Sequence, residues 1–271
     1  MFVRMIFLLL LAWQPLCAAS LADQFAREGY VEIADLQHTT AAFDSLYARF
    51  DELIEFLQTN PVWAQKLYSA KERFIRSKER SYYSTDFFGF YDESGGRNQI
   101  SFYYSTHFHE FICSHSPEFN QVPPITRFLE ACLEIQKPCG NWFDEAAAEL
   151  GLETISSCST LLKVVKYLPS YVATRPHYDG TAFSLFLDST DNESLLLSPY
   201  KSSFTVDDFF SPQRHSILLI PGAFLTEFSI YPTPHIVLQS GKTRYATIAF
   251  AMRPNYTSPK IELSPLPRFK D

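Results

Sequence analysis

The clearest helical pattern in the chain lies in residues 39–58, TTAAFDSLYARFDELIEFLQ. Its apolar positions recur at steps of three and four, and they are Phe43, Leu46, Tyr47, Phe50, Leu53, Ile54 and Leu57. Because this spacing places the side chains on one face, it predicts an amphipathic helix capped by Thr39 or Thr40. Two shorter helices are predicted by the shared faces of Ile125, Phe128, Leu129, Cys132 and Leu133, and of Trp142, Phe143, Ala146, Ala147 and Leu150.

Two other segments before residue 155 lack this helical period. Residues 20–38 are predicted to form an opening strand with its approach, since GYVEIADL, residues 29–36, alternates in polarity. Residues 81–111, SYYSTDFFGFYDESGGRNQISFYYSTHFHEF, are rich in aromatics and interrupted by glycine. That composition predicts loops and short strands in this segment.

From about residue 156 the pattern changes to short β-rich runs separated by turn residues. The six runs are STLLKVVKYL, TAFSLFLDS, ESLLLSPY, SILLIPGAFLTEF, PHIVLQS and TRYATIAFAM. DSTDNES, between the second and third runs, is typical of a hairpin turn. Six such strands in so short a segment predict an antiparallel sandwich or barrel.

The expected organisation is therefore an N-terminal helical and loop region packed on a β core. The helical region is placed at residues 20–155, the core at 156–252, and an extended, proline-spaced tail at 253–271. No linker separates two independently folded halves, so one catalytic-sized unit is expected.

Residues 1–19 have the layout of a secretory signal peptide. One positive charge precedes the apolar run IFLLLLAW, and Cys17, Ala18 and Ala19 supply small residues near a cleavage point. The run is too short for a membrane-spanning helix. We therefore expect export, with a buried N-terminal helix of a cytoplasmic protein as the alternative.

Composition narrows the classes of partner. Apolar residues make up 46% of the chain and aromatic residues 16%, which predicts a globular fold. The formal net charge is −7, and no basic cluster is present to neutralise phosphates, so a nucleic-acid partner is not expected. We expect a monomer that binds a small molecule and has no membrane span.

Four cysteines remain if residues 1–19 are removed, and they are Cys113, Cys132, Cys139 and Cys158. An even number in an exported chain permits two disulfides, while four scattered thiols remain the alternative. No Cys-x-x-Cys motif occurs, which disfavours a structural zinc site built on cysteines.

Candidate metal-binding chemistry begins at His177 and Asp179. Residues two apart on an extended chain project from the same face, so these two side chains are expected to lie together. His235, at the start of a later predicted strand, is the best candidate for a third ligand. Two imidazoles and one carboxylate form the facial set that binds Fe(II) in non-haem oxygenases, although zinc also accepts these ligands.

Arg244 lies nine residues after His235, on the last predicted strand. An arginine that faces the interior of a β domain is costly unless it meets an anion. Its planar guanidinium suits a carboxylate such as the far end of 2-oxoglutarate.

The residues around these positions resemble the isopenicillin N synthase-like family of Fe(II)/2-oxoglutarate-dependent oxygenases. The resemblance rests on KVVKYLPSYVATRPHYDGTAFSLFL, IPGAFL and PTPHIVLQSGKTRYATIAF. It implies a double-stranded β-helix, or jelly roll, with iron ligands His177, Asp179 and His235. Arg244 matches the arginine that binds the cosubstrate, and Tyr167 lies near a tyrosine that contacts cosubstrate or substrate.

The resemblance implies an enzyme that uses Fe(II), 2-oxoglutarate and dioxygen to hydroxylate or desaturate a small organic substrate. Ala246 departs from the family pattern, because a serine that helps to hold the cosubstrate usually stands there. Thr247 does not substitute directly, since neighbouring residues of a strand face opposite sides. An iron oxidase that needs no 2-oxoglutarate and a catalytically silent jelly-roll binding module are the alternatives.

Two further features suggest chemistry less strongly. His107 and His109 form a second histidine pair, but they lack an accompanying carboxylate motif and are expected to be solvent-facing loop residues. The aromatic cluster from Tyr82 to Tyr91 is expected to serve in core or lid packing.

Overall fold

A computed structural model of the chain describes residues 20–33, 40–152, 158–170, 175–212, 217–238, 240–253 and 262–269. The predicted leader, residues 1–19, lies outside the described residues. Seven strands form one antiparallel sheet, in the order β1-β7-β5-β9-β4-β3-β2. Their bounds are β1 Val31–Ile33, β2 Gly89–Glu93, β3 Gln99–Tyr104, β4 Ser159–Tyr167, β5 Phe183–Ser189, β7 Ile217–Pro221 and β9 Arg244–Met252.

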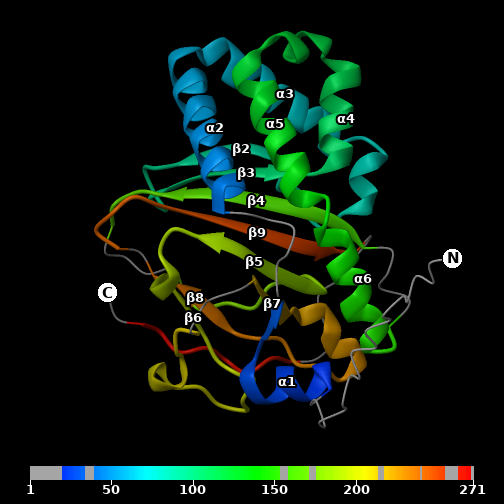
Figure 1. Ribbon diagram of the computed structural model, residues 1–271, viewed down its shortest axis with the longest axis vertical. Coiled ribbons are helices and arrows are strands. Elements are labelled where there is room, and N and C mark those ends of the chain that lie inside the picture. Colours follow the sequence, from blue (N-terminus) through cyan, green and yellow to red (C-terminus); the bar gives the residue numbers. More distant parts are fainter. Residues whose placement is uncertain are drawn as a thin grey trace, which may run out of the picture.

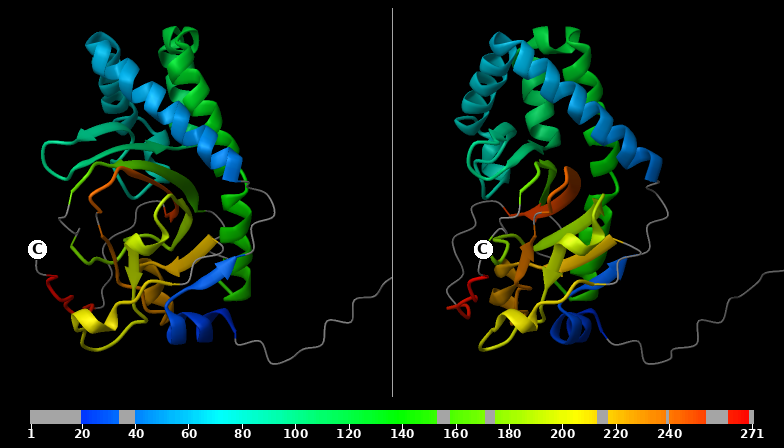
Figure 2. Two further views of the ribbon diagram at one scale, coloured as in Figure 1. Left: turned by 60° about the vertical axis from the view of Figure 1, so that its left-hand side comes forward. Right: turned by 90° about the vertical axis from the view of Figure 1, so that its left-hand side faces the viewer.

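A second, two-stranded sheet pairs β6, Leu195–Leu197, with β8, His235–Val237. Both sheets contribute to one apolar cluster, which contains Phe186 of β5, Leu195 and Leu197 of β6, and Ile248 of β9. The two sheets thus pack face to face, and the strands curve around a common interior (Figure 2). This is the jelly-roll arrangement expected from the sequence.

Four helices form a layer over one face of the large sheet (Figure 1), and they are α2 Thr40–Thr59, α3 Pro61–Ile75, α4 Thr106–His115 and α5 Pro123–Gln136. Helix α6, Cys139–Glu149, runs along the side of the sheet. The predicted apolar face of α2 is buried, and Phe50 stacks on Phe128 of α5 at 5.2 Å between ring centroids. Phe128 in turn contacts Phe102 of β3 at 5.0 Å, so aromatic side chains join the helical layer to the sheet.

The sequence pattern was wrong in three respects, namely the opening strand, two helices of the helical layer and the strand pairing. Leu21–Glu28 is the helix α1, and among the described residues of the predicted opening strand only Val31–Ile33 is β structure. The segment THFHEF belongs to α4 instead of a loop, and α3 was not predicted. The third error concerns strand pairing, because β5 pairs with β7 and β9 while β6 pairs with β8. DSTDNES is therefore no hairpin turn, but a crossing between the two sheets that contains the short 3-10 turn Asn192–Ser194.

Further 3-10 turns occupy Glu79–Tyr82, Pro117–Gln121, Val206–Asp208 and Ala223–Phe228. Residues 262–269 of the predicted tail contain no helix or strand. Leu266 and Phe269 pack against the cluster of Phe204, Phe209 and Ile236, outside the small sheet. The cysteines at positions 113, 132, 139 and 158 are free thiols.

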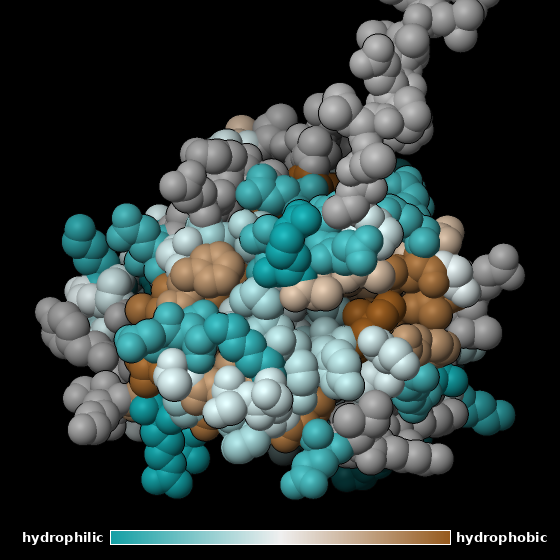
Figure 3. All heavy atoms as spheres, turned by 90° about the horizontal axis from the view of Figure 1, so that it is seen from below, coloured by the Kyte–Doolittle hydropathy of each residue, from teal (hydrophilic) through white to brown (hydrophobic). Residues whose placement is uncertain are grey.

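Within the described residues, no helix is both long and apolar enough to cross a membrane. On the face seen from below, hydrophobic side chains form separate areas with hydrophilic residues between them (Figure 3).

Candidate metal centre

Backbone hydrogen bonds bring the three predicted ligands together. His177 and His235 exchange N–H···O bonds of 3.0 Å each, so the chain before β5 is held beside β8. The carbonyl oxygen of Asp179 accepts a 2.7 Å bond from the N–H of Ala223, which follows β7. Three segments far apart in the sequence thus fix the positions of the three side chains.

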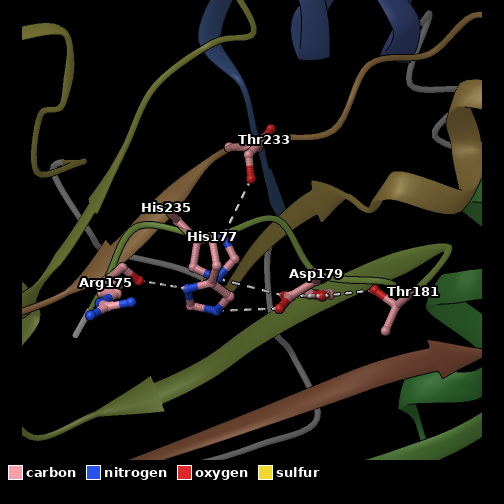
Figure 4. Close-up of polar contacts among 7 residues, drawn as sticks. Arg175, His177, Asp179, Thr181, Thr233 and His235 are labelled. Carbon is pink, nitrogen blue, oxygen red and sulfur yellow. Dashed lines mark hydrogen bonds and ion pairs between the residues drawn. The ribbon is translucent and has the colours of Figure 1, made fainter. Parts of the chain in front are cut away.

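The side chains converge on one point (Figure 4). The Nε2 atom of His177 lies 3.6 Å from Oδ1 of Asp179, and Nε2 of His235 lies 3.7 Å from Oδ2. Candidate ligand atoms of the three residues all lie within 4.8 Å of one another. These separations suit three donors around a single cation, since metal–ligand bonds near 2 Å place donors on one face about 3 Å apart or slightly more.

Hydrogen bonds at the far side of each imidazole determine its tautomer. Nδ1 of His177 lies 3.2 Å from the carbonyl oxygen of Arg175, and Nδ1 of His235 lies 3.3 Å from that of Thr233. Because a carbonyl oxygen only accepts, each Nδ1 must carry the proton. In the neutral form of each ring, Nε2 therefore presents a lone pair toward Asp179, as a metal ligand requires.

The charge states also suit a cation. Burial lowers the pKa of His235 to about 4, so its ring is neutral at neutral pH. Burial alone would raise the pKa of the Asp179 carboxyl, but His235, His177 and a hydrogen bond from Ser184 outweigh that effect and lower it. The Ser184 hydroxyl donates to Oδ2 of Asp179 at 2.6 Å. The site therefore offers a carboxylate at Asp179 and a neutral imidazole at His235.

A cavity of about 1020 Å³ opens on the triad. The side chain of His177 is 48% exposed, that of Asp179 14%, and that of His235 only 3%. The buried side of the triad is thus closed by protein, while its open side faces the cavity. A cation held there would keep positions free for small ligands.

Arg244 is buried at the start of β9, as predicted, with 2% of its surface exposed. Its Nη1 donates to the hydroxyl of Ser194 at 2.7 Å, its Nη2 donates to the carbonyl of Leu238, and its guanidinium lies 4.0 Å over the Tyr167 ring. No described carboxylate forms an ion pair with it, and its buried Nε lacks a hydrogen-bond partner. Burial lowers the pKa of Arg244, and the nearby Tyr167 and Asp191 offset only part of that effect.

Tyr167 lines the cavity and stacks on the guanidinium of Arg244, whereas Arg244 itself is not among the lining residues. Ala246 packs against Val165 and Tyr167 in the barrel interior. Thr247 points the other way, and its hydroxyl donates to Tyr47 of α2 at 3.1 Å. Thr247 therefore does not supply the hydroxyl that position 246 lacks.

The second histidine pair has a structural role. Nδ1 of His107 lies 2.8 Å from the Tyr83 hydroxyl, and Nδ1 of His109 lies 3.0 Å from the Tyr104 hydroxyl. Both histidines are half-buried on α4, so the expectation of solvent-facing loop residues was wrong. Within the described part of the chain, the only cluster with metal-ligand geometry is the His177, Asp179 and His235 set.

The aromatic cluster divides between two roles. Tyr83 and Phe88 are fully buried in the core, while Phe87 is 50% exposed and lines the cavity.

Two further functional candidates were not predicted from the sequence. Ser184 supports Asp179, and Lys163 of β4 lines the cavity. The alternation of β4 carried a signal for Lys163, because residues 163, 165 and 167 share a face.

No family model and no curated protein matches this sequence. Solved structures do match the fold. AtDAO1, the dioxygenase for auxin oxidation 1 from Arabidopsis thaliana, in its binary complex with 2-oxoglutarate, has a TM-score of 0.59 at 15% identity, over 88% of each chain. The fold is that of the 2-oxoglutarate/Fe(II) oxygenases. The dioxygenase for auxin oxidation from rice gives 0.57 at 14% identity, over 89% of this chain and 80% of that one. JOX2, in complex with 2OG, Fe and JA, gives 0.53 at 16% identity, over 90% and 72%.

Proposed function

We propose that this protein is a non-haem Fe(II)- and 2-oxoglutarate-dependent oxygenase that hydroxylates or desaturates a small organic substrate. The observation that carries the proposal is the convergence of His177, Asp179 and His235 at the mouth of a cavity. AtDAO1 and JOX2, which share the fold, are described in complexes with 2-oxoglutarate. Two imidazoles and a carboxylate, with an open side, are the donor set of this class of iron site.

The residues of the chain have separate roles in this proposal. The triad would hold Fe(II), which supplies the activation of dioxygen when it is bound with a 2-oxo acid. Ser184 and the carbonyl oxygens of Arg175 and Thr233 orient the three ligands. The cavity walls would position the substrate and limit the access of water.

Arg244 is the proposed partner of the far carboxylate of 2-oxoglutarate. Its orphaned Nε and the absence of an ion pair with any described carboxylate favour an anion that comes from outside the chain. Because Arg244 stacks on Tyr167 and does not itself line the cavity, this ring or its neighbours would have to shift to admit the carboxylate. The same observation, together with Ala246, favours a 2-oxoglutarate-independent iron oxidase as the second candidate.

Anaerobic reconstitution with Fe(II), followed by visible absorption with and without 2-oxoglutarate, tests the proposal. Wild-type protein should bind one Fe(II) and develop a new absorption band only when 2-oxoglutarate is added. His177→Ala and Asp179→Ala should each weaken Fe(II) binding by a hundredfold or more, because a three-ligand site loses one donor. His115→Ala is the matched control, since His115 lies exposed on α4.

Stoichiometric iron in the His177→Ala/Asp179→Ala double variant would contradict the metal assignment. Iron binding without any response to 2-oxoglutarate would favour the oxidase.

A further inference from the structure

The cavity beside the triad carries the opposite charge to the whole chain. Arg97, Lys163 and Arg175 are among its lining residues, while Asp179 is its only lining carboxylate within the described residues. The chain as a whole has a formal net charge of −7. Focused positive charge in a cleft of an acidic protein favours an anionic ligand.

The three cations differ in how free they are to bind. Arg97 lies at the rim, where its side chain is 68% exposed and its Nη1 is 3.4 Å from Oε1 of Glu93. Arg175 is exposed next to the open side of His177. Lys163 is half-buried, and its amino group forms no hydrogen bond or ion pair with the described residues. A half-buried ammonium without an anionic partner is costly, so Lys163 is the cation best suited to receive a ligand.

The neighbouring lysine of the same strand shows the contrast. Lys166 lies on the opposite face of β4, where its Nζ is 2.7 Å from Oδ1 of Asp51. On the inward face, Lys163 lies beside Tyr103 of β3, with Nζ 5.6 Å from the ring centroid. Lys166 therefore has an ion-pair partner within the fold, whereas Lys163 lines the cavity without a carboxylate partner among the described residues.

Lys163 also lies close to the triad. Burial and the other ligand side chains dominate the pKa values of Asp179 and His235, and the charge of Lys163 acts on both as a smaller influence. A divalent cation on the triad would neutralise the one carboxylate nearby. Among the described residues that line the cavity, no uncompensated negative charge would then remain, which strengthens the preference of Lys163 for an anion.

The rest of the wall is apolar and aromatic. Leu161 and Met252 line the cavity from the core, and Phe87 lines it at the exposed side. Phe87 stacks on Tyr103 at 5.3 Å between ring centroids, which places an aromatic pair next to Lys163. A cavity volume of about 1020 Å³ is enough for 2-oxoglutarate and a second small molecule, and it is in the size range of small-molecule sites.

We propose that the substrate is a small organic acid with an apolar or aromatic body, and that Lys163 binds its carboxylate. The body would lie against Phe87, Tyr103 and Met252, and the carboxylate would meet the ammonium of Lys163. This inference extends the proposed oxygenase function and rests on it, because the bound acid is a substrate only if the protein is an oxygenase. The ligand class itself follows from the cavity alone.

A pair of probes that differ only in charge tests the inference, namely 4-phenylbutanoate and 4-phenylbutanamide. Their dissociation constants are measured by ligand-observed NMR titration on full-length protein that has been stripped of metal and dialysed free of chelator. Wild-type protein should bind the acid roughly tenfold more tightly than the amide, as expected for one charge-assisted contact.

Variants assign the preference to one side chain. In Lys163→Met the acid-to-amide ratio should fall to about one, and in Lys163→Arg it should return. Lys166→Met is the matched control, since it removes a lysine from the same strand without changing the cavity, and its ratio should equal that of wild type. Equal ratios in wild type and Lys163→Met, or no preference in wild type, would overturn the inference.

The affinity for 2-oxoglutarate distinguishes a lysine that binds substrate from one that binds cosubstrate. Lys163→Met should bind 2-oxoglutarate within about threefold of wild type when loaded with Mn(II). A loss as large as that for 4-phenylbutanoate would make Lys163 a cosubstrate residue and overturn the assignment to substrate. Failure of wild type to bind Mn(II) or 2-oxoglutarate would instead refute the proposed function, while the probe ratios on metal-free protein still decide the role of Lys163.

Discussion

Arg244 and Ala246 lie two residues apart on β9, facing the same side of the strand, and only Arg244 offers polar groups to an anion. If the far carboxylate of 2-oxoglutarate meets Arg244, truncating this arginine removes one partner of a buried charge pair. Such a loss costs roughly 3–5 kcal/mol, or more than a hundredfold in affinity. Ala246→Ser should instead improve binding two- to tenfold, because one hydrogen bond contributes about 0.5–1.5 kcal/mol.

Isothermal titration of Mn(II)-loaded protein with 2-oxoglutarate measures both effects. Arg253→Ala is the matched control, since Arg253 lies just past the end of β9 and its exposed side chain pairs with Glu227. If wild type and Arg244→Ala bind 2-oxoglutarate equally well, Arg244 is not the anchor.

At the level of single residues, sequence spacing found the triad but not its surroundings. His177, Asp179 and His235 were predicted from residue type, alternation and strand order, and the structure brings them together. The interactions of Arg244 with Ser194 and Leu238 could not be predicted, because they depend on how β9 lies against the chain around the small sheet. Lys163 was missed although its strand position pointed inward, since a lysine in a largely apolar strand that contains a second lysine carries no family motif.

Among the elements, the turn after β7 does most to position Asp179. A Cβ atom at Gly222 would lie 2.1 Å from the carbonyl oxygen of Thr181, well inside any contact distance. The N–H of Gly222 donates to Ala182 at 2.8 Å, and that of Ala223 donates to Asp179 at 2.7 Å. Glycine is needed here for the close approach of two backbone segments.

Gly222→Ala should therefore destabilise the fold by roughly 1–3 kcal/mol or more, because backbone and not a flexible side chain must move. It should also weaken metal binding, since the displaced segment carries Asp179. Urea unfolding and Mn(II) titration measure the two effects. Gly95→Ala is the control, because nothing lies within 4 Å of a Cβ there. Equal stability of the two variants would show that the turn tolerates a side chain.

The type of each β element was predictable, whereas its partners were not. All six strand segments predicted after residue 156 contain strands β4 to β9. Alternation identifies a strand without specifying its neighbour, so β5 and β6 were wrongly joined as a hairpin. Helix α1 was missed although its signals were present, namely the capping box of Ser20 with Asp23 and the left-handed Gly29 at its end.

For the molecule as a whole, a polar network fixes the helical layer to the outer face of the barrel. Asp51 of α2 pairs with Lys166 of β4 at 2.7 Å and accepts a 2.5 Å bond from the Tyr245 hydroxyl of β9. Close by, the Tyr47 hydroxyl donates to Asp188 at 2.8 Å. These contacts join segments more than a hundred residues apart, which is why sequence periodicity predicted α2 but not where it docks.

This network makes the stability of the fold sensitive to alkaline pH. Burial alone would lower the pKa of Lys166, but the bonds to Asp51 and Tyr245 outweigh it and raise the pKa above its ordinary value. Burial and the bond to Asp51 raise the pKa of Tyr245. Because both folded-state values lie above the unfolded values of about 10.4 and 10, the network stabilises fully below pH ~10. That stabilisation is lost as the pH rises through the folded-state values.

Lys166→Met should accordingly lower the free energy of unfolding by up to about 1 kcal/mol at pH 8, since Asp51 is partly exposed and solvent screens the pair. The difference between wild type and Lys166→Met should shrink as the pH rises toward 11, because the unfolded chain then loses the lysine proton and Lys166 begins to lose its charge. Urea unfolding at pH 8, 9.5 and 11 measures this difference in the free energy of unfolding.

Buried tyrosines lower the stability of both proteins at alkaline pH, so only the difference between the two proteins is diagnostic. Lys163→Met is the control, since Lys163 forms no hydrogen bond or ion pair with the described residues and its effect on stability should not follow this pH trend. A difference between wild type and Lys166→Met that stays constant from pH 8 to 11 would mean that Lys166 stabilises the fold through packing and not through its charge.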